Sequence, residues 1–554
     1  MADKSFDAIV VGGGHHGTII ACYLAHAGLE TAIFERQHEL GGGACGEELP
    51  LPGFIQNPCA HFTRFYGHPA YEDFNLREKG LVYVFPEQNE GMIFDDDTSF
   101  IGYSAWRVVD PITGKAQFSQ ENAEKTLKEI AKFSERDAET AAGLLEKYKS
   151  KWRAAFHEYR YSPPTPYGVK DALERLIDDP EGGIEPVYEL MTSQQLAYDL
   201  FESPELRTLF MRSVETSTGS FAQDVIGLYV YIHTIGLMLS WEPAAIVLGG
   251  THTITHALQR AFAEMGGKYF VSKEVDKVLI ENGVARGIRL ADGSEIEARK
   301  LVVSDLGANQ TILRLIGEDI VGHKIAHRVR NINYDRAQLF WGNLAMHELP
   351  KYKVAAANPE VGPQPRLYWG PKDPDYLATR YQAEIFTQGY PSKMFILTAP
   401  DSIWDRTRVP TTKHTILVEE FTAPHRMFSD RQWLRMKKDI VDEILKQWQV
   451  YAPNMTRDNV IGSFITTPYD VVNRNIDMLE GGWVEGSMIA SQLGRYRPTP
   501  ELAHYRTPVK NLYICSSNLH SGGGIGRGSS YCCYKKIAED HGLRKVWEEK
   551  GRPY

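Results

Sequence analysis

The stretch DAIVVGGGHHGTIIACYLAHAGLETAIFERQHELGGGACGEE, residues 7–48, decides the fold of this chain. Its first five residues are a short apolar run, which predicts a buried strand. The segment TIIACYLAHAG then carries apolar residues at helical spacing until Gly28 ends the pattern. TAIFE follows as a second buried strand. A strand, a loop, a helix and a strand in this order predict the unit of a parallel sheet covered by helices.

The loop of this unit holds the pattern Gly12-x-Gly14-x-x-Gly17 between the first strand and the helix. In a dinucleotide-binding fold the first glycine makes the tight turn, the second lets the backbone approach a pyrophosphate, and the third lets helix and strand pack closely. The positive end of the helix then faces the phosphates. Glu35 lies 23 residues after Gly12, at the end of the second strand, where a carboxylate can accept hydrogen bonds from a ribose. The sequence therefore predicts a bound dinucleotide.

Two further glycine-rich segments extend this prediction. Gly41, Gly42 and Gly43 follow Glu35 within the segment RQHELGGGA. Near the C-terminus, NLYICSSNLHSGGGIGRGSSYCCYKKIAED, residues 511–540, predicts a strand, a glycine-rich loop and a helix. The backbone amides of such a loop, together with the positive end of its helix, can contact a flavin ring or a pyrophosphate.

The rest of the chain separates these nucleotide-binding segments from one another. Helical periodicity covers residues 127–152 and 170–213, strands joined by turns at Asn282-Gly283 and Asp292-Gly293 cover 278–304, further strands fall between 338 and 422, and a helix is expected over 430–450. We predict an α/β (α+β) fold with a discontinuous Rossmann-like domain and a substrate domain of mixed antiparallel sheet and helices. The predicted nucleotide domain comprises residues 1–90, 245–315 and 480–554, and the substrate domain comprises residues 91–244 and 316–479.

Residues 7–48 resemble the opening of FAD enzymes of the phytoene-desaturase-like family, in which the second glycine patch continues the phosphate contacts. The segments LGGTHTITHALQRAFAEMGG, residues 248–267, and EVDKVLIENGVARGIRLADGSEIEARKLVVS, residues 274–304, agree with this resemblance, as does the C-terminal glycine loop. The segment GGWVEGSMIASQLGRYRPTP, residues 481–500, is most similar to the branch that includes pyridine nucleotide-disulfide oxidoreductase domain-containing protein 2.

The resemblance implies an FAD-dependent oxidoreductase that transfers a hydride between a substrate carbon and the flavin. The implied substrate is a small molecule that is hydrophobic, cyclic or polyene, and desaturation, saturation and isomerisation all stay open. Because the chain has no second dinucleotide fingerprint, electrons are expected to pass to oxygen, a quinone or another acceptor. The implied FAD contacts are Gly12, Gly14, His16, Gly17, Glu35, Arg36, Gly42, Gly43, Val275, Ser304, Asn518, Gly523, Gly524 and Ile525.

His520, beside the C-terminal glycine loop, is the candidate catalytic residue, because an imidazole can donate to a reduced flavin or exchange a proton near neutral pH. A bracing role for His520 is the favoured alternative, since hydride transfer is the chemistry of the flavin itself. Ser516 and Ser521 stand where the family usually has glycine and proline, and this departure argues against a strict carotenoid desaturase. Arg495 and Arg497 could line the site or be structural.

Two other functions are weighed against this one. Amine oxidases share the N-terminal fingerprint, so an amine or alcohol oxidase of a small polar or aromatic substrate is an alternative, although the C-terminal HSGGG form is closer to the desaturase branch. A non-catalytic binding protein on the same fold is an alternative of another class, because Rab GDP-dissociation inhibitors resemble this fold. Intact glycines in all three contact regions argue against it.

Composition narrows the range of partners and compartments. A net charge of −10 argues against a nucleic-acid partner, because such a surface needs a clustered basic field. None of the six cysteines has the two-residue spacing of a redox or metal pair, which favours a reduced, cytoplasmic chain without a metal site. The N-terminus runs directly into the first strand, so no signal peptide is expected. The most apolar window, residues 225–239, is too short to span a bilayer and predicts a buried helix beside the substrate, with peripheral membrane contact as the alternative.

Overall fold

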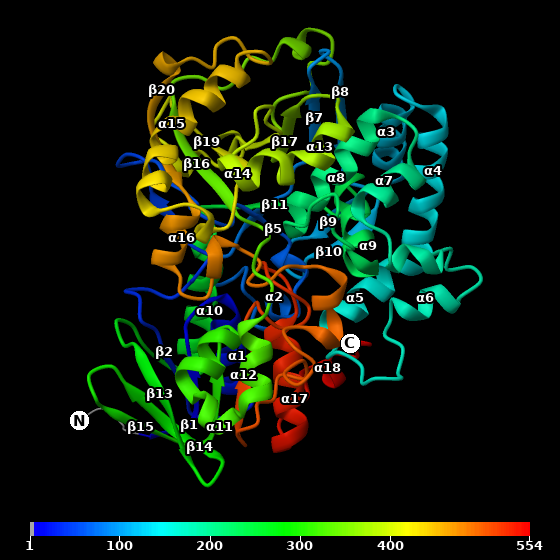
Figure 1. The fold of residues 1–554 in the computed structure, drawn as a ribbon. Coiled ribbons are helices and arrows are strands. Elements are labelled where there is room, and N and C mark those ends of the chain that lie inside the picture. The colour runs from blue at the N-terminus through cyan, green and yellow to red at the C-terminus, as the bar shows by residue number, and fades with distance from the viewer. Residues whose placement is uncertain (1–4) are drawn as a thin grey trace.

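The structure, a computed structural model, describes residues 5–554, and Figure 1 shows its fold. One half of the molecule is built around a five-stranded parallel sheet. The strands lie in the order β12 (Lys268–Phe270), β2 (Thr31–Phe34), β1 (Ser5–Val11), β15 (Glu295–Ser304) and β21 (Leu512–Ile514). Val11 lies opposite Phe34 and Ser304, and Ser304 lies opposite Ile514, so four of these strands end at one edge. Both ends and the middle of the chain therefore build one sheet.

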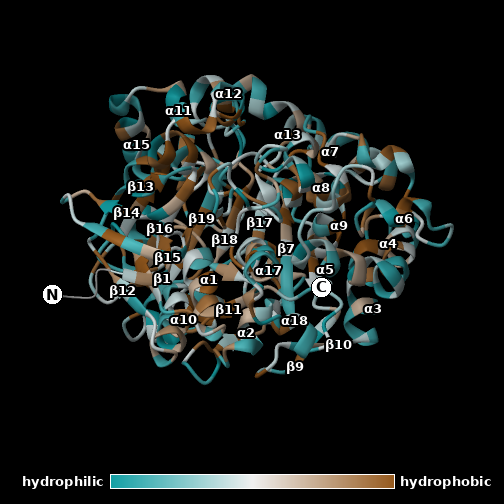
Figure 2. Ribbon diagram, turned by 90° about the horizontal axis from the view of Figure 1, so that it is seen from below, coloured by the Kyte–Doolittle hydropathy of each residue, from teal (hydrophilic) through white to brown (hydrophobic). Residues whose placement is uncertain are grey.

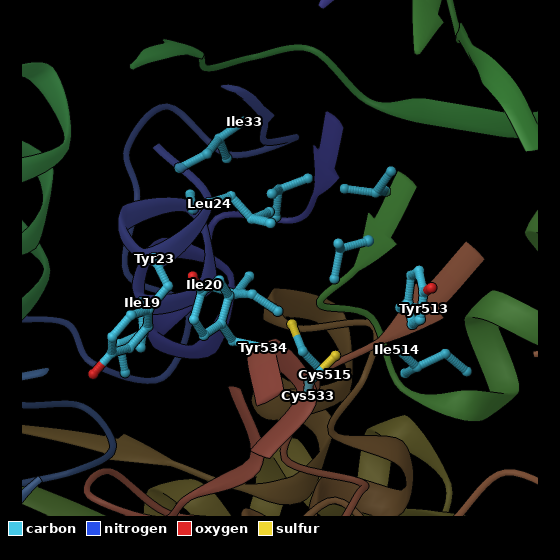
Figure 3. Close-up of a cluster of buried hydrophobic side chains, with 14 of the residues drawn as sticks. Ile19, Ile20, Tyr23, Leu24, Ile33, Tyr513, Ile514, Cys515, Cys533 and Tyr534 are labelled. Carbon is cyan, nitrogen blue, oxygen red and sulfur yellow. The ribbon is translucent and has the colours of Figure 1, made fainter. Parts of the chain in front are cut away.

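Helices α1 (His15–His26), α10 (His252–Glu264) and α17 (Ser529–His541) pack into the core of this sheet. Figure 3 shows Ile20 and Leu24 of α1 between Ile33 of β2 and Tyr534 of α17. The rings of Tyr23 and Tyr534 stack with their centroids 5.0 Å apart. From Gly17 to Ala25 helix α1 is buried throughout, and its residues there are small or largely apolar.

An antiparallel hairpin joins the first half of β15. It consists of β13 (Val275–Glu281) and β14 (Val284–Leu290), and the predicted two-residue turn at Asn282-Gly283 connects the two strands. Both turn residues have positive φ, 51° and 76°, which is the backbone that an Asn-Gly pair adopts most readily in a hairpin. The predicted strand meander is therefore confirmed.

A second sheet of seven strands forms the other half of the molecule. Its order is β20 (Val460–Thr466), β16 (Leu339–Met346), β19 (His414–Phe421), β18 (Ile396–Ala399), β17 (Arg366–Gly370), β7 (Gln88–Phe94) and β8 (Ser99–Tyr103). All neighbours are antiparallel except β17 and β7. The strands expected between 338 and 422 are confirmed as β16, β18 and β19.

Each face of the second sheet has its own helical cover. Met92 and Phe94 of β7 join the core of α8 (Pro204–Thr218) and α9 (Gly227–Met238). Ile93, between them, points to the opposite face and joins the core of α15 (Asp430–Trp448). This division follows from the two-residue period of a strand, and α15 confirms the helix expected over 430–450.

Shorter elements complete the two halves. The remaining helices are α2 (Pro69–Asp73), α3 (Gln120–Ala131), α4 (Glu135–Lys147), α5 (Arg153–Tyr161), α6 (Glu174–Asp178), α7 (Ser193–Leu200), α11 (Glu318–Val321), α12 (His323–Arg330), α13 (Pro374–Arg380), α14 (Phe386–Gln388), α16 (Pro468–Arg474) and α18 (Val546–Glu549). The remaining strands are β3 (Glu47–Glu48), β4 (Ile55–Gln56), β5 (Phe62–Thr63), β6 (Tyr83–Val84), β9 (Trp106–Asp110), β10 (Lys115–Phe118) and β11 (Ala245–Val247).

The predicted fold class, α/β with a Rossmann-like sheet and a second mixed sheet, is confirmed, whereas the exact domain boundaries stay a prediction. The apolar window of residues 225–239 forms the buried helix α9, as expected. In residues 5–554 no helix combines the length and the apolar character needed to cross a membrane. Figure 2 shows how polarity is distributed across the molecule, with hydrophobic residues concentrated in the central strands and hydrophilic ones on the peripheral helices.

Candidate functional site

The glycine loop between β1 and α1 packs closely against Asp305, the residue that follows the neighbouring strand β15. Gly12 has a φ of +94°, and its amide donates to the carbonyl of Phe34 at 2.9 Å. A Cβ at Gly14 would lie 2.6 Å from Oδ2 of Asp305, and a Cβ at Gly17 would lie 2.3 Å from the carbonyl oxygen of Gly12. Any side chain at these positions would therefore displace the backbone or Asp305.

Glu35 holds the glycine loop from the end of β2. Its Oε2 accepts from the amide of Gly13 and its Oε1 accepts from the amide of Gln37, both at 2.7 Å. The carboxylate is thereby fixed at the mouth of the loop, with lone pairs left for a further donor. This is the position from which a ribose hydroxyl could be bound.

The second glycine patch touches the first. The amide of Gly41 donates to the carbonyl of Gly13 at 2.8 Å, and Gly14 and Gly41 form an isolated parallel bridge. A Cβ at Gly42 would lie 3.2 Å from Cα of Gly14. The two patches therefore form one continuous wall, and glycine is the residue that permits this approach.

The C-terminal glycine loop, residues 515–528, follows β21 and leads into α17. The hydroxyl of Ser529 donates back to the carbonyls of Cys515 and Ser516, at 3.0 and 2.8 Å, and so closes the base of the loop. A Cβ at Gly523 would lie 2.5 Å from the carbonyl oxygen of Val484, which shows how closely the loop approaches the segment before it.

Arg497 fastens this loop to that segment. Its guanidinium donates to the carbonyls of Leu519 and Ser517 in the loop, at 3.1 and 3.0 Å, and to the carbonyl of Val484 at 2.8 Å. The side chain is fully buried and has a structural role, so it does not line the site. Arg495 does not line the cavity either, and its largely buried side chain pairs with Glu174.

All three glycine regions open into one cavity of about 900 Å³. From the glycine regions the cavity reaches the second sheet, where Leu339 and Trp341 of β16 and Glu419 of β19 line it. Oε1 of Glu419 accepts from Nε1 of Trp341 at 3.0 Å. A ligand held by the glycine loops could therefore meet a second molecule held by the second sheet inside the same cavity.

Buried carboxyl groups surround the glycine end of this cavity. Burial, reinforced by the nearby carboxyl of Glu485, holds the pKa of Asp305 well above its usual range. Burial and the proximity of Asp477 raise the pKa of Glu485 in the same way. Burial raises the pKa of Asp477 to about 7, and its Oδ1 accepts from the amide of Gly307 at 2.8 Å. Protonated carboxyl groups can donate hydrogen bonds, so this end can hold an anionic group.

Comparison with known proteins supports an oxidoreductase function. Residues 10–72 match the model of the NAD(P)-binding Rossmann-like domain. The chain is 26% identical to pyridine nucleotide-disulfide oxidoreductase domain-containing protein 2 of Rattus norvegicus, over 96% of this chain and 94% of that protein. It is 24% identical to a limonene dehydrogenase component of Castellaniella defragrans, over 99% of this chain and 97% of that protein. The chain is an oxidoreductase.

Two further matches fit this conclusion. A neurosporene-forming phytoene desaturase of Cereibacter sphaeroides is 39% identical over 69 residues, which are 12% of this chain and 13% of that protein. A solved oxidoreductase structure from Methanosarcina mazei superposes with a TM-score of 0.59 and 16% identity, covering 96% of this chain and 99% of that one, and shows the shared fold. The predicted resemblance is thus confirmed, and the non-catalytic alternative is disfavoured.

The structure brings most of the predicted cofactor residues of the oxidoreductase to the cavity wall. These are Gly12, Gly14, Glu35, Arg36, Gly42, Gly43, Val275, Gly523, Gly524 and Ile525. Four others lie behind the wall. The Nδ1 atom of His16 is 3.2 Å from Oγ of Ser530, Gly17 packs on Gly12, Oγ of Ser304 is 2.7 Å from Oγ1 of Thr311, and Oδ1 of Asn518 accepts from the amide of Ala308 at 3.1 Å. Their contact with a cofactor stays a prediction.

His520 lies behind the C-terminal loop and does not line the cavity. Its Nε2 donates to the carbonyl of Tyr159 at 2.7 Å, and its own carbonyl accepts from the hydroxyl of Tyr505 at 2.8 Å. Burial lowers the pKa of His520 to about 4, so the ring is neutral near pH 7. This environment supports the bracing role, and a catalytic role stays an untested prediction.

Sequence reasoning missed most of the basic side chains of the cavity wall. Arg64, Arg160, His233 and Arg527 all line it, and they come from the segment after β5, from α5, from α9 and from the C-terminal loop. Arg527 stands inside the C-terminal glycine motif, and His233 stands inside the apolar window of residues 225–239 that was expected beside the substrate. Arg64 and Arg160 lie in no such segment, and the fold alone brings them to the cavity.

A metal centre is not formed at this site. Within the described part of the chain, no group of three or more histidine, cysteine, aspartate or glutamate side chains could hold a metal ion. All six cysteines are free, and burial raises the pKa of Cys45, which lines the cavity, to about 12. A thiol with such a pKa is a poor nucleophile at neutral pH.

Proposed function

We propose that the chain is an FAD-dependent oxidoreductase, a dehydrogenase, desaturase or oxidase, that transfers a hydride between a substrate carbon and the flavin. The observation that carries this proposal is the convergence of three glycine regions, from residues 12–14, 41–43 and 523–526, on a single cavity of about 900 Å³. The helix α1 begins at His15, so its positive end also faces this space.

The residues present fit FAD. A Cβ on Gly14 or Gly17 would strike Asp305 or the backbone, so only glycine fits these two positions, and a loop without side chains permits the close approach of a pyrophosphate. Glu35 would accept from the adenosine ribose, and the backbone of Val275 lies where an adenine could be held. The C-terminal loop lies against Val484 and lines the cavity further along, where a flavin ring would be placed. When bound, FAD would supply the hydride chemistry itself.

The chain's own contribution is to bind, orient and exclude water. The walls beyond the glycine regions include Phe62, Leu237, Leu339 and Trp341, which suit a largely apolar substrate body. A small hydrophobic, cyclic or polyene molecule would fill this space. Electrons would then pass to oxygen, a quinone or another acceptor.

The test is the visible spectrum of the purified protein, followed by anaerobic addition of candidate substrates. We expect a yellow protein whose flavin band bleaches with a cyclic or polyene substrate. Glu35→Gln removes the carboxylate that the ribose would meet, and we expect FAD affinity to fall about tenfold, the scale of one charge-assisted hydrogen bond. Glu30→Gln, in an exposed ion pair with Arg299 near the same strand, is the matched control. A colourless protein that takes up no FAD would overturn the proposal.

A further inference from the structure

The substrate end of the cavity holds an excess of buried positive charge. Burial lowers the pKa of His233 well below its usual range, and nearby positive charges lower it further. These charges belong to four arginines, Arg527, Arg160, Arg64 and Arg366. Arg64, Arg160, Arg527 and His233 line the main cavity. We call Arg64, Arg160 and Arg527 the arginine cluster.

The nearby carboxylates are already paired with other residues. Glu90 lies 3.1 Å from Arg366, and Glu242 lies 2.5 Å from Arg153. Among residues 5–554, no carboxylate oxygen lies within 4.0 Å of a guanidinium nitrogen of the arginine cluster. The cluster therefore carries three positive charges that the chain does not neutralise by ion pairs.

The neutral contacts of the cluster hold the guanidinium groups without discharging them. Arg64 donates to the carbonyl of Glu242, and Arg527 donates to the hydroxyl of Tyr229 and, at 3.4 Å, to the carbonyl of Ser217. Arg160 lies over the ring of Phe156, 4.4 Å from its centroid, and its buried Nε has no hydrogen-bond partner.

These charges cannot be removed by deprotonation near neutral pH. Arg160 and Arg527 are only 7% and 6% exposed, yet arginine stays protonated in proteins. Burial lowers the pKa of Arg64 to about 10, which still leaves it charged at pH 7. A buried charge without a partner is costly, so a cluster of three is expected to receive an anion from outside the chain.

There is also space for such a group. Arg64, Arg160 and Arg527 all line the main cavity of about 900 Å³, which has room for an oxyanion. A second cavity of about 50 Å³ adjoins it at Arg64, Arg160 and His233, but the ion pair of Glu242 with Arg153 also lines that cavity. Phe62, Trp341 and Trp483, in contrast, supply large apolar surfaces to the main cavity.

We propose that the substrate carries an oxyanion, a carboxylate or a phosphate ester, which the arginine cluster binds while the apolar body of the substrate lies along the aromatic walls toward the glycine loops. This inference rests on the proposed flavin-dependent function and narrows its substrate class. Planar guanidinium groups bind carboxylate and phosphate oxygens through paired hydrogen bonds, so the cluster would fix the orientation of the substrate as well as its affinity.

The test uses the FAD-loaded protein and four probes that share one ring. Benzoate and phenyl phosphate carry the two oxyanions, and benzyl alcohol and benzamide are neutral. Binding is followed by calorimetry and by the change in the flavin absorption band. We expect at least one anionic probe to bind tenfold or more tightly than both neutral probes, and the comparison of benzoate with phenyl phosphate identifies which oxyanion the site prefers.

Arg160→Gln is expected to weaken the anionic probe by about ten- to a hundredfold, the effect of one charged hydrogen bond, and to leave the neutral probes and the FAD content unchanged. Arg160→Lys keeps the charge and should restore part of the affinity. Arg175→Gln is the matched control. Arg175, on α6, forms an exposed ion pair with Glu158, which lies on α5 like Arg160.

Equal affinity for charged and neutral probes, or an anion affinity that Arg160→Gln does not change, would overturn the inference. Failure of the proposed function gives a different result, because the protein would then take up no FAD. Calorimetry with the flavin-free protein still measures binding to the arginine cluster in that case, so the two outcomes are separated.

Discussion

Asp477 shows how a single residue at the glycine end of the cavity couples stability to pH. Burial raises its pKa to about 7, whereas an aspartate in an unfolded chain has a pKa of about 3.9. The folded state therefore binds this proton more tightly than the unfolded state does. The stability that this group contributes is complete below pH 4 and is lost as the pH rises through 7.

We therefore compare the free energy of unfolding of flavin-free Asp477→Asn with that of the flavin-free wild type at pH 5 and at pH 8. We expect the variant's stability relative to the wild type to be about 2 kcal/mol higher at pH 8 than at pH 5. The amide keeps an oxygen that can accept from Gly307. Denaturant unfolding of both proteins at the two pH values measures the difference, and the exposed Asp458→Asn is the control. Identical pH profiles for the wild type and Asp477→Asn would show that Asp477 is ionised in the folded state throughout.

At the scale of elements, the C-terminal glycine loop depends on a residue that never touches the cavity. Arg497 satisfies carbonyl groups on both sides of the contact between the loop and residues 484–486. Removing it leaves several buried carbonyls without a donor, and each such group costs on the order of 1–3 kcal/mol.

We expect Arg497→Gln to lower the melting temperature and to raise the FAD concentration needed for half-saturation, because the loop would lose its fixed approach to the cavity. Thermal unfolding and quenching of flavin fluorescence measure the two effects. Arg495→Gln is the control, since Arg495 lies two residues away and pairs with Glu174. Wild-type FAD affinity in a folded Arg497→Gln protein would show that the loop holds its shape without this clamp.

At the scale of the whole molecule, one ligand should stabilise segments that lie hundreds of residues apart. β1, β15 and β21 are neighbours in one sheet, although they begin at Ser5, Glu295 and Leu512. A ligand that binds only the folded state protects the elements around it from opening.

We expect FAD to slow hydrogen exchange together in peptides covering residues 5–34, 297–304 and 512–528. Exchange followed by mass spectrometry, with and without FAD, measures this protection. Peptides of α15, which pack on the far face of the second sheet, serve as the internal reference and should change less. Protection confined to residues 5–34 would contradict a site shared by all three segments.

The half of the molecule that contains the parallel sheet could be predicted from the sequence, because the sequence patterns that mark it are local. Gly12, Gly14, Glu35 and the Asn282-Gly283 turn each act within a short segment, and the structure places them as the pattern indicated. The arginine cluster could not be predicted in the same way. Arg64, Arg160 and Arg527 come from three unrelated segments, and only the tertiary fold makes them neighbours.

The pairing of β7 with β17 escaped prediction for a similar reason. The two strands are parallel neighbours, yet almost half of the chain separates them. No turn residues mark a long-range contact of this kind, and the hydrophobic pattern of β7 gives only its tendency to be a strand. The boundary expected at residue 90 accordingly falls inside β7 (Gln88–Phe94).

The position of β21 in the parallel sheet has a consequence for synthesis on the ribosome. The second sheet has all its strands once Thr466 has emerged, whereas β1, which precedes these strands in the chain, must wait for Leu512–Ile514 before the sheet around it is complete. Domains generally fold as units while the chain is being made, beginning with the N-terminal one. Here the parallel sheet, which contains β1, can be completed only after the second sheet has all its strands.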